Sequence, residues 1–147
     1  MRLFFLSIVA ALLAAFPLSA QNVIGPEALV SARKVNTWVC NTRGGDVPSA
    51  FQIGMDLYAR HATAYVPKGA FCMSAGALAW LGGWHRRAEG RLLFHGMSPL
   101  PDPEDRWQQF MLYASWGVPQ YIAFKIVSLD PDEVWEPSPE DLAVLSR

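Results

Sequence analysis

The sequence lacks the features that define several large classes of protein. It has 12 Lys and Arg against 13 Asp and Glu, so it lacks the basic excess that nucleic acid or an anionic membrane surface requires. It contains no internal repeat and no low-complexity segment. Its two cysteines are too few for a zinc site. We therefore expect no nucleic-acid partner, no bound metal and no other cofactor.

The only long hydrophobic run stands at the start of the chain. Arg2 precedes an apolar stretch over residues 3–16, and Pro17-Leu18-Ser19-Ala20 follows it. A short apolar run that ends in small residues is typical of a secretory signal peptide, and it is too short to span a bilayer comfortably. We expect residues 1–20 to be a signal peptide, the location to be periplasmic or secreted, and the mature chain to have no stable membrane anchor. An uncleaved N-terminal anchor or a buried helix is the alternative.

Residues 21–147 have the usual size of a single domain. Segments rich in β-formers alternate with helical ones, which is typical of an α/β fold with a mainly parallel sheet. Strands are expected at residues 35–40, 63–66 and 91–95, and a loop is expected at residues 84–90. Helices are expected at residues 26–34, 48–60, 75–81, 104–116 and 120–127, with a further helix starting at Ser138.

The cysteines and tryptophans give narrower expectations. Cys40 and Cys72 are candidates for a disulfide, because an exported chain with an even number of cysteines often forms one. Two buried thiols are the alternative. Trp38, Trp80 and Trp107 fall at apolar-periodic positions and are expected in the core. The tryptophans at positions 84 and 116 lie near loops, where they could contact a ligand or partner.

Three segments together carry the parts that acyl transfer needs. Gly44 and Gly45 form a turn after a predicted strand, Ser74 precedes an apolar helix, and His95 closes a further strand. A serine hydroxyl becomes a nucleophile when a base removes its proton and N–H donors stabilise the oxyanion. The alternative for Ser74 is an ordinary helix N-cap.

The order of these segments resembles the Clp-protease/crotonase superfamily, and most of all its small exported Clp-protease-like members. Thr42-Arg43-Gly44-Gly45-Asp46-Val47 looks like the family's Ser-Pro-Gly-Gly-x-Val turn, and Cys72-Met73-Ser74-Ala75-Gly76 resembles its Cys-x-Ser-Ala nucleophile segment. Leu93-Phe94-His95 is similar to the strand that presents the base. The resemblance covers residues 35–145 and implies layered βα units with a mainly parallel sheet. The segment before Val35 is shorter than in the family.

The resemblance assigns a role to each matching residue. It implies that Ser74 is the nucleophile, that His95 is the base, and that the N–H groups of Gly45 and Ala75 form the oxyanion hole. The third member of the triad falls at Glu133, with two aspartates, Asp130 and Asp132, close enough to take its place.

Two functions from different classes follow. The first is a serine hydrolase, expected to be a peptidase acting on a peptide or protein and able to form a homo-oligomer. The second is a catalytically inactive Clp-like fold that serves as a binding or assembly module, which the short N-terminal segment and Arg43 in place of the usual proline favour. A crotonase-like acyl-thioester enzyme is a weaker third reading, because coenzyme A is not expected outside the cytoplasm.

Overall fold

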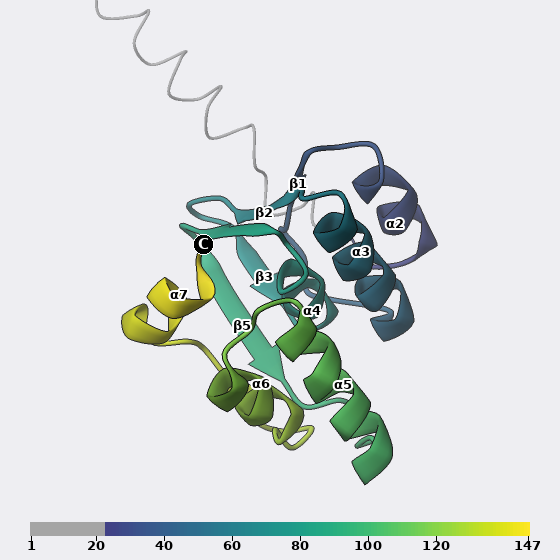
Figure 1. Cartoon of the computed structure of the whole chain (residues 1–147), viewed down its shortest axis with the longest axis vertical. Coiled ribbons are helices and arrows are strands. Elements are labelled where there is room, and N and C mark those ends of the chain that lie inside the picture. Colours follow the sequence, from purple (N-terminus) through teal and green to yellow (C-terminus); the bar gives the residue numbers. More distant parts are fainter. Residues whose placement is uncertain (1–22) are drawn as a thin grey trace, which may run out of the picture.

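The computed structural model describes residues 23–147, which fold as helices packed around two small sheets (Figure 1). The helices are α2 Pro26–Ala32, α3 Val47–Ala59, α4 Ala75–Trp80, α5 Pro103–Ser115, α6 Gln120–Val127 and α7 Pro139–Leu145. The strands are β1 Thr37–Val39, β2 Thr63–Val66, β3 Phe71–Met73, β4 His85–Ala88, β5 Arg91–His95 and β6 Val134–Trp135. None of the helices in this described part is long and apolar enough to cross a bilayer.

Each sheet has three strands, and most pairs are parallel. The first sheet has the order β1-β2-β4 with parallel pairing throughout. In the second sheet, of order β3-β5-β6, β3 and β5 are parallel and β6 is antiparallel to β5. The predicted α/β class with a mainly parallel sheet is therefore confirmed.

The chain passes from the first sheet to the second three times, and each time a helix follows. β1 leads to an isolated parallel bridge between Thr42 and Cys72 and then to α3. β2 continues into β3 and α4, and β4 continues into β5 and α5. This repeated strand–strand–helix path brings the ends of the second-sheet segments together at Thr42, Met73 and His95, which is where the candidate site lies.

Local sequence signals explain where the long helices begin. The carboxylate of Asp46 accepts a hydrogen bond from the backbone N–H of Ser49 at the start of α3, and Asp102 does the same for Asp105 at the start of α5. Ser138 Oγ accepts from the N–H of Asp141 and caps α7. A proline follows each cap, where its missing N–H costs nothing.

The centre of the core is a close crossing of α3 and the end of α4. All six residues of α4 are buried, as expected for a helix without a polar face. A side chain at Gly82 would collide with the backbone of Gly54 on α3, so only glycine permits this approach. On its other side Gly54 lies against the ring of Trp116, which is 2% exposed. Trp116 is therefore a core residue, contrary to the expectation that it contacts a ligand.

A buried arginine joins β4 to the C-terminal segment. Arg86 is 1% exposed, and its guanidinium donates to the carbonyl oxygens of Leu145, Leu81 and Trp116 at 2.7, 2.9 and 3.1 Å. Burial, reinforced by the nearby charge of Arg147, lowers the pKa of Arg86 to about 10, so it remains a cation at neutral pH. Its backbone also pairs with that of Arg147 in both directions.

Three expectations about the elements are wrong, for identifiable reasons. The loop expected at residues 84–90 contains β4, whose polar sequence His85-Arg86-Arg87-Ala88 hides the one buried position in the strand. The short strand β3 was not anticipated before Ser74. Trp107 is 60% exposed and stacks on Phe110 on the surface of α5, so apolar periodicity alone misplaced it in the core.

Replacing Tyr113 with phenylalanine is expected to stabilise the fold by about 1 kcal/mol. The Tyr113 side chain is fully buried between Phe51 and Trp116, and its hydroxyl finds no hydrogen-bond partner among the described residues. Burial raises the pKa of Tyr113, so the phenol is neutral and its desolvation is uncompensated. Thermal unfolding should show a rise in Tm. Tyr121→Phe is the matched control, because the exposed hydroxyl of Tyr121 donates to Asp141. Its removal should lower the Tm or leave it unchanged.

Candidate active site

Ser74 stands at the turn between β3 and α4 with a strained backbone. Its φ is 57° and its ψ is −125°, a conformation that residues with a side chain rarely adopt. The side chain makes no capping hydrogen bond to α4, so the ordinary N-cap interpretation has no support in the geometry. A serine on a strained strand-to-helix turn, with its hydroxyl left free, is the arrangement that presents a nucleophile in many hydrolases.

The pairing of β3 with β5 brings Ser74 close to His95. Met73 is paired with Leu93, and the N–H of Ser74 donates to the carbonyl oxygen of Leu93 at 3.0 Å. Extending that parallel register by one residue sets Ser74 beside Phe94, and His95 follows at once. Ser74 and His95 are both half-buried, which leaves each side chain partly open to solvent. The register thus places the two predicted residues at the same end of the second sheet.

The imidazole of His95 is oriented by its own chain. Its Nδ1 lies 2.7 Å from the carbonyl oxygen of Gly96. A carbonyl oxygen can only accept, so Nδ1 is the donor in this contact and carries the proton. The neutral ring then has its lone pair on Nε2, which is the nitrogen available to act as a base.

The predicted acids lie beside His95, and their carboxylates make other contacts. β6 pairs His95 with Val134, so Glu133 comes opposite Gly96 in the same register. A side chain at Gly96 would collide with the backbone of Asp130, which shows how closely this turn approaches. The Glu133 carboxylate accepts from the N–H of Asp130 at 3.0 Å, and no carboxylate of residues 23–147 hydrogen-bonds to His95.

The carboxyl groups of this turn interact with one another. A hydrogen bond that the protonated Asp130 carboxyl donates to Glu133, and then repulsion from the charge of Glu133, raise the pKa of Asp130 above its usual value, and the charge of Asp132 adds to this. All three acidic residues are exposed. The turn therefore concentrates negative charge near His95 without a direct hydrogen bond to the ring.

Gly44 lies against Ser74 and Gly45 lies against Ile24, and both positions need glycine. Gly44 has φ 117°, and a Cβ there would lie 2.8 Å from Ser74 Cβ and 3.1 Å from its Oγ. Gly45 has φ 146° and is held by Ile24, whose N–H donates to Gly44 and whose carbonyl accepts from Asp46. The glycine in contact with Ser74 is thus Gly44, one position before the predicted oxyanion residue.

The N–H groups of this turn differ in their availability. The N–H of Gly44 donates to Thr42 Oγ1 at 3.0 Å, so it is already engaged. Within residues 23–147 the N–H groups of Gly45 and Ala75 donate no backbone hydrogen bond, and that of Ala75 lies 3.3 Å from the Cβ position of Gly44. These two N–H groups remain the ones that could receive a developing oxyanion. Arg43, which precedes the turn, is exposed.

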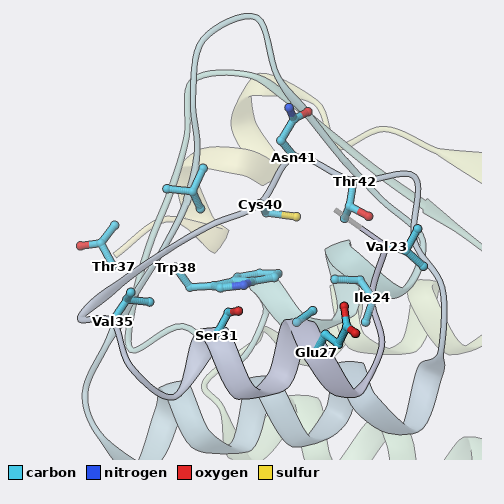
Figure 2. Close-up of a pocket in the computed structure, with 12 residues that line it drawn as sticks. Val23, Ile24, Glu27, Ser31, Val35, Thr37, Trp38, Cys40, Asn41 and Thr42 are labelled. Carbon is cyan, nitrogen blue, oxygen red and sulfur yellow. The ribbon is translucent and has the colours of Figure 1, made fainter. Parts of the chain in front are cut away.

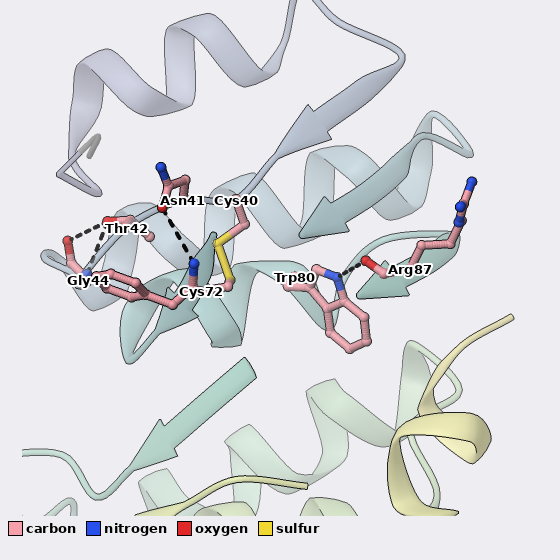
Figure 3. Close-up of a disulfide and its surroundings, with 8 residues drawn as sticks. Cys40, Asn41, Thr42, Gly44, Cys72, Trp80 and Arg87 are labelled. Carbon is pink, nitrogen blue, oxygen red and sulfur yellow. Dashed lines mark hydrogen bonds between the residues drawn. A yellow bond between two sulfur atoms is a disulfide. The ribbon is translucent and has the colours of Figure 1, made fainter. Parts of the chain in front are cut away.

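A disulfide joins the strand that leads to the glycine turn with the strand that leads to Ser74. Cys40 and Cys72 are bonded, with their Cα atoms 5.3 Å apart, and both are buried (Figure 3). Their sulfur atoms pack under Gly76 on α4, where a Cβ would lie 3.1 Å from Cys40 Sγ. The bridge therefore links the two segments that carry the glycine turn and Ser74, and it packs against α4 next to them.

A groove of about 570 Å³ runs between α2 and β1. Figure 2 shows the Trp38 ring at its centre, with Glu27 and Ser31 of α2 on one side and Cys40 on the other. Val23 and Ile24 close the end nearest Thr42. β1 is an edge strand of the first sheet, since among the described strands it pairs with β2 alone, and the backbone bonds of Asn36 and Cys40 also go to the β2 segment.

The described residues offer no metal centre. Among residues 23–147, no group of three or more His, Cys, Asp and Glu side chains lies close enough to hold an ion.

The fold is that of the Clp-type proteases. It is similar to ClpP1 from Listeria monocytogenes, with a TM-score of 0.60 and 15% identity over 86% of this chain and 84% of that one. A mutant of the same Listeria protein gives a TM-score of 0.55 and 18% identity over the same shares. A mutant of the 1510-N membrane-bound stomatin-specific protease gives 0.56 and 13% identity, over 78% of this chain and 69% of that one.

These similarities confirm the expected Clp-protease-like fold. No protein-family model matches the chain, and no curated protein matches its sequence. At such identities the likeness concerns the fold, so the activity must be argued from the site.

Proposed function

We propose that this chain is an exported serine hydrolase, acting as a peptidase, with Ser74 as the nucleophile and His95 as the general base. The observation that carries the proposal is the backbone of Ser74. Ser74 has a strained φ of 57°, and its hydroxyl does not cap α4, so helix capping does not explain the strain. Such strain is often found where a backbone presents a catalytic side chain, as a nucleophilic serine would require. The similarity of the fold to that of Clp-type proteases supports the same reaction class.

The geometry supports a two-step acyl transfer. Ser74 Oγ attacks the carbonyl carbon of the substrate while Nε2 of His95 takes the hydroxyl proton. The N–H groups of Gly45 and Ala75 stabilise the oxyanion, and the imidazolium returns the proton to the leaving amine. Water then attacks the acyl-enzyme carbonyl while Nε2 of His95 takes its proton, and the imidazolium returns that proton to Ser74 Oγ as the acid product leaves. The carbonyl of Gly96 holds the imidazole in the required tautomer.

The groove beside β1 supports an extended polypeptide as the substrate. An edge strand offers unpaired N–H and C=O groups to a second extended chain, and the groove gives its side chains space. A polypeptide is accordingly the proposed partner.

Self-association is proposed from a different face. The apolar side chains of Trp107, Met111 and Phe124 on α5 and α6 are 50–65% exposed, which is unusual for a surface that meets only water. Burial of this surface against a second copy would account for it.

Export is proposed from two independent features. The first 20 residues have the organisation of a signal peptide, although they lie outside the described residues. The Cys40–Cys72 bridge supports an oxidising compartment, where disulfides persist. A periplasmic or secreted peptidase is consistent with both.

A catalytically inactive binding module is the second candidate. It is favoured by His95, whose Nδ1 hydrogen bond goes to a backbone carbonyl and not to a carboxylate. In that case the groove would bind a polypeptide without cleaving it.

A fluorophosphonate probe separates the two candidates. The hydrolase should become covalently labelled, and peptide mapping by mass spectrometry should find the adduct on Ser74. Ser74→Ala should abolish labelling while leaving the fold intact, and exposed Ser128 provides a matched Ser128→Ala control that labels normally. A folded wild-type protein that stays unlabelled between pH 6 and pH 9 would favour the binding module.

A further inference from the structure

Thr42 lies where the glycine turn, the nucleophile strand and the disulfide meet. It is 1% exposed, although its side chain is polar. Its backbone N–H donates to the carbonyl of Phe71 at 2.9 Å, and its carbonyl accepts from the N–H of Met73 at 3.0 Å. These two bonds fix Thr42 against β3 immediately before Ser74.

The hydroxyl of Thr42 binds the glycine turn twice. Thr42 Oγ1 accepts from the N–H of Gly44 at 3.0 Å and donates to the carbonyl of Gly44 at 3.3 Å (Figure 3). A buried hydroxyl that satisfies both polar groups of one residue determines where that residue sits. The carbonyl of Gly44 also accepts from Ile24, so the turn is held from both sides.

The methyl group of Thr42 has a separate role. It packs directly on Gly76 in α4, in the space that a side chain at Gly76 would fill, next to the disulfide sulfur atoms. Thr42 thus uses its methyl to contact the helix behind Ser74 and its hydroxyl to hold the turn in front of it.

We propose that Thr42 is a positioning residue that sets the glycine turn against Ser74. By donating to the carbonyl of Gly44 and accepting from its N–H, the hydroxyl orients the Gly44–Gly45 peptide so that the N–H of Gly45 is directed to the oxyanion. Because Thr42 is 1% exposed, it acts through the glycine turn and not on the reacting atoms. This inference rests on the proposed hydrolase function, since it assigns a purpose to the turn that only a reacting Ser74 would use.

The test compares three substitutions by their rate of labelling at Ser74. Thr42→Val keeps the shape and removes the hydroxyl, and we expect the labelling rate constant to fall about tenfold with little change in the affinity for the probe. Thr42→Ser keeps the hydroxyl and should label within about twofold of the wild type. Thr63→Val makes the same change at a half-buried position of β2, outside the groove, and should also label normally.

Amide hydrogen exchange is a second measurement of the same hydrogen bond, and it does not depend on activity. The N–H of Gly44 should be protected in the wild type and in Thr42→Ser, and should lose protection in Thr42→Val. If Thr42→Val does not fold, Thr42→Ala removes the hydroxyl without adding bulk near Gly44 and takes its place.

The outcomes separate this inference from the proposed function. A folded Thr42→Val protein that labels at the wild-type rate, or a Gly44 amide that exchanges freely in the wild type, would overturn the positioning role. A wild type that no probe labels would instead defeat the hydrolase, and the role of Thr42 in presenting the oxyanion donor would fall with it.

Discussion

A His95→Ala variant is expected to label with a fluorophosphonate probe about a thousand times more slowly than the wild type. His95 is the basic side chain that the β3–β5 register brings to the same end of the second sheet as the half-buried Ser74. The tautomer set by the Gly96 carbonyl leaves the base on Nε2, so removal of the ring removes the base entirely. The measurement is the second-order rate constant of labelling, followed by mass spectrometry at several pH values.

Control variants test whether the loss of labelling is specific to His95. His85 is exposed on β4, and His85→Ala should label at the wild-type rate. Glu133→Gln and Asp130→Asn should cost less than about tenfold, because the Gly96 carbonyl continues to orient the imidazole. If Glu133→Gln were as damaging as His95→Ala, the carboxylate would have to reach the ring during the reaction. If His95→Ala labelled normally, His95 would have no role as the base.

The elements with a clear hydrophobic pattern were predictable from the sequence. β2, β5 and α6 have the bounds that were expected. In each of these elements the hydrophobic pattern of the sequence agrees with the packing in the folded chain, so tertiary contacts do not change the local preference.

β4 shows why other elements were not predictable. Its only buried residue is a charged one, Arg86, and the carbonyl groups that compensate for its burial come from distant segments. A sequence pattern carries no information on those partners. The predictions for Trp107 and Trp116 are wrong for a similar reason: Trp116 is buried by its contact with Gly54 on another helix, which the local pattern does not show, and Trp107 is 60% exposed although its position is apolar-periodic.

The sequence identified which segments contribute to the candidate site, but it did not indicate how their residues are oriented toward one another. The order of Gly-Gly, Ser and His identified the segments that meet at one end of the second sheet. The positive φ of Ser74, the contact of Gly44 with Ser74 and the two hydrogen bonds of Thr42 depend on how the strands cross between the sheets. From the sequence alone, Thr42 looks like an ordinary residue at the end of a strand, because its hydrogen bonds to the glycine turn become visible only in the structure.

Replacing both cysteines, in a Cys40→Ala/Cys72→Ala variant, is expected to lower the free energy of unfolding by about 3–4 kcal/mol. The bridge closes a loop with a sequence separation of 32 residues, and opening it restores the conformational entropy of that loop in the unfolded chain. Both side chains are buried, so the variant also loses packing beneath Gly76. Denaturant unfolding of the oxidised wild type and the double variant measures the difference.

Thiol titration and labelling complete the test of the disulfide. The denatured, unreduced wild type should show no free thiol and should show two after reduction. Because the bridge ties Cys40, two residues before Thr42, to Cys72, two residues before Ser74, the double variant should also label more slowly even where it is fully folded. Two free thiols in the unreduced protein, or a double variant as stable as the wild type, would contradict this account. A variant that loses stability and still labels at the full rate would show that the hydrogen bonds of Thr42 and Ile24 hold the glycine turn against Ser74 without the bridge.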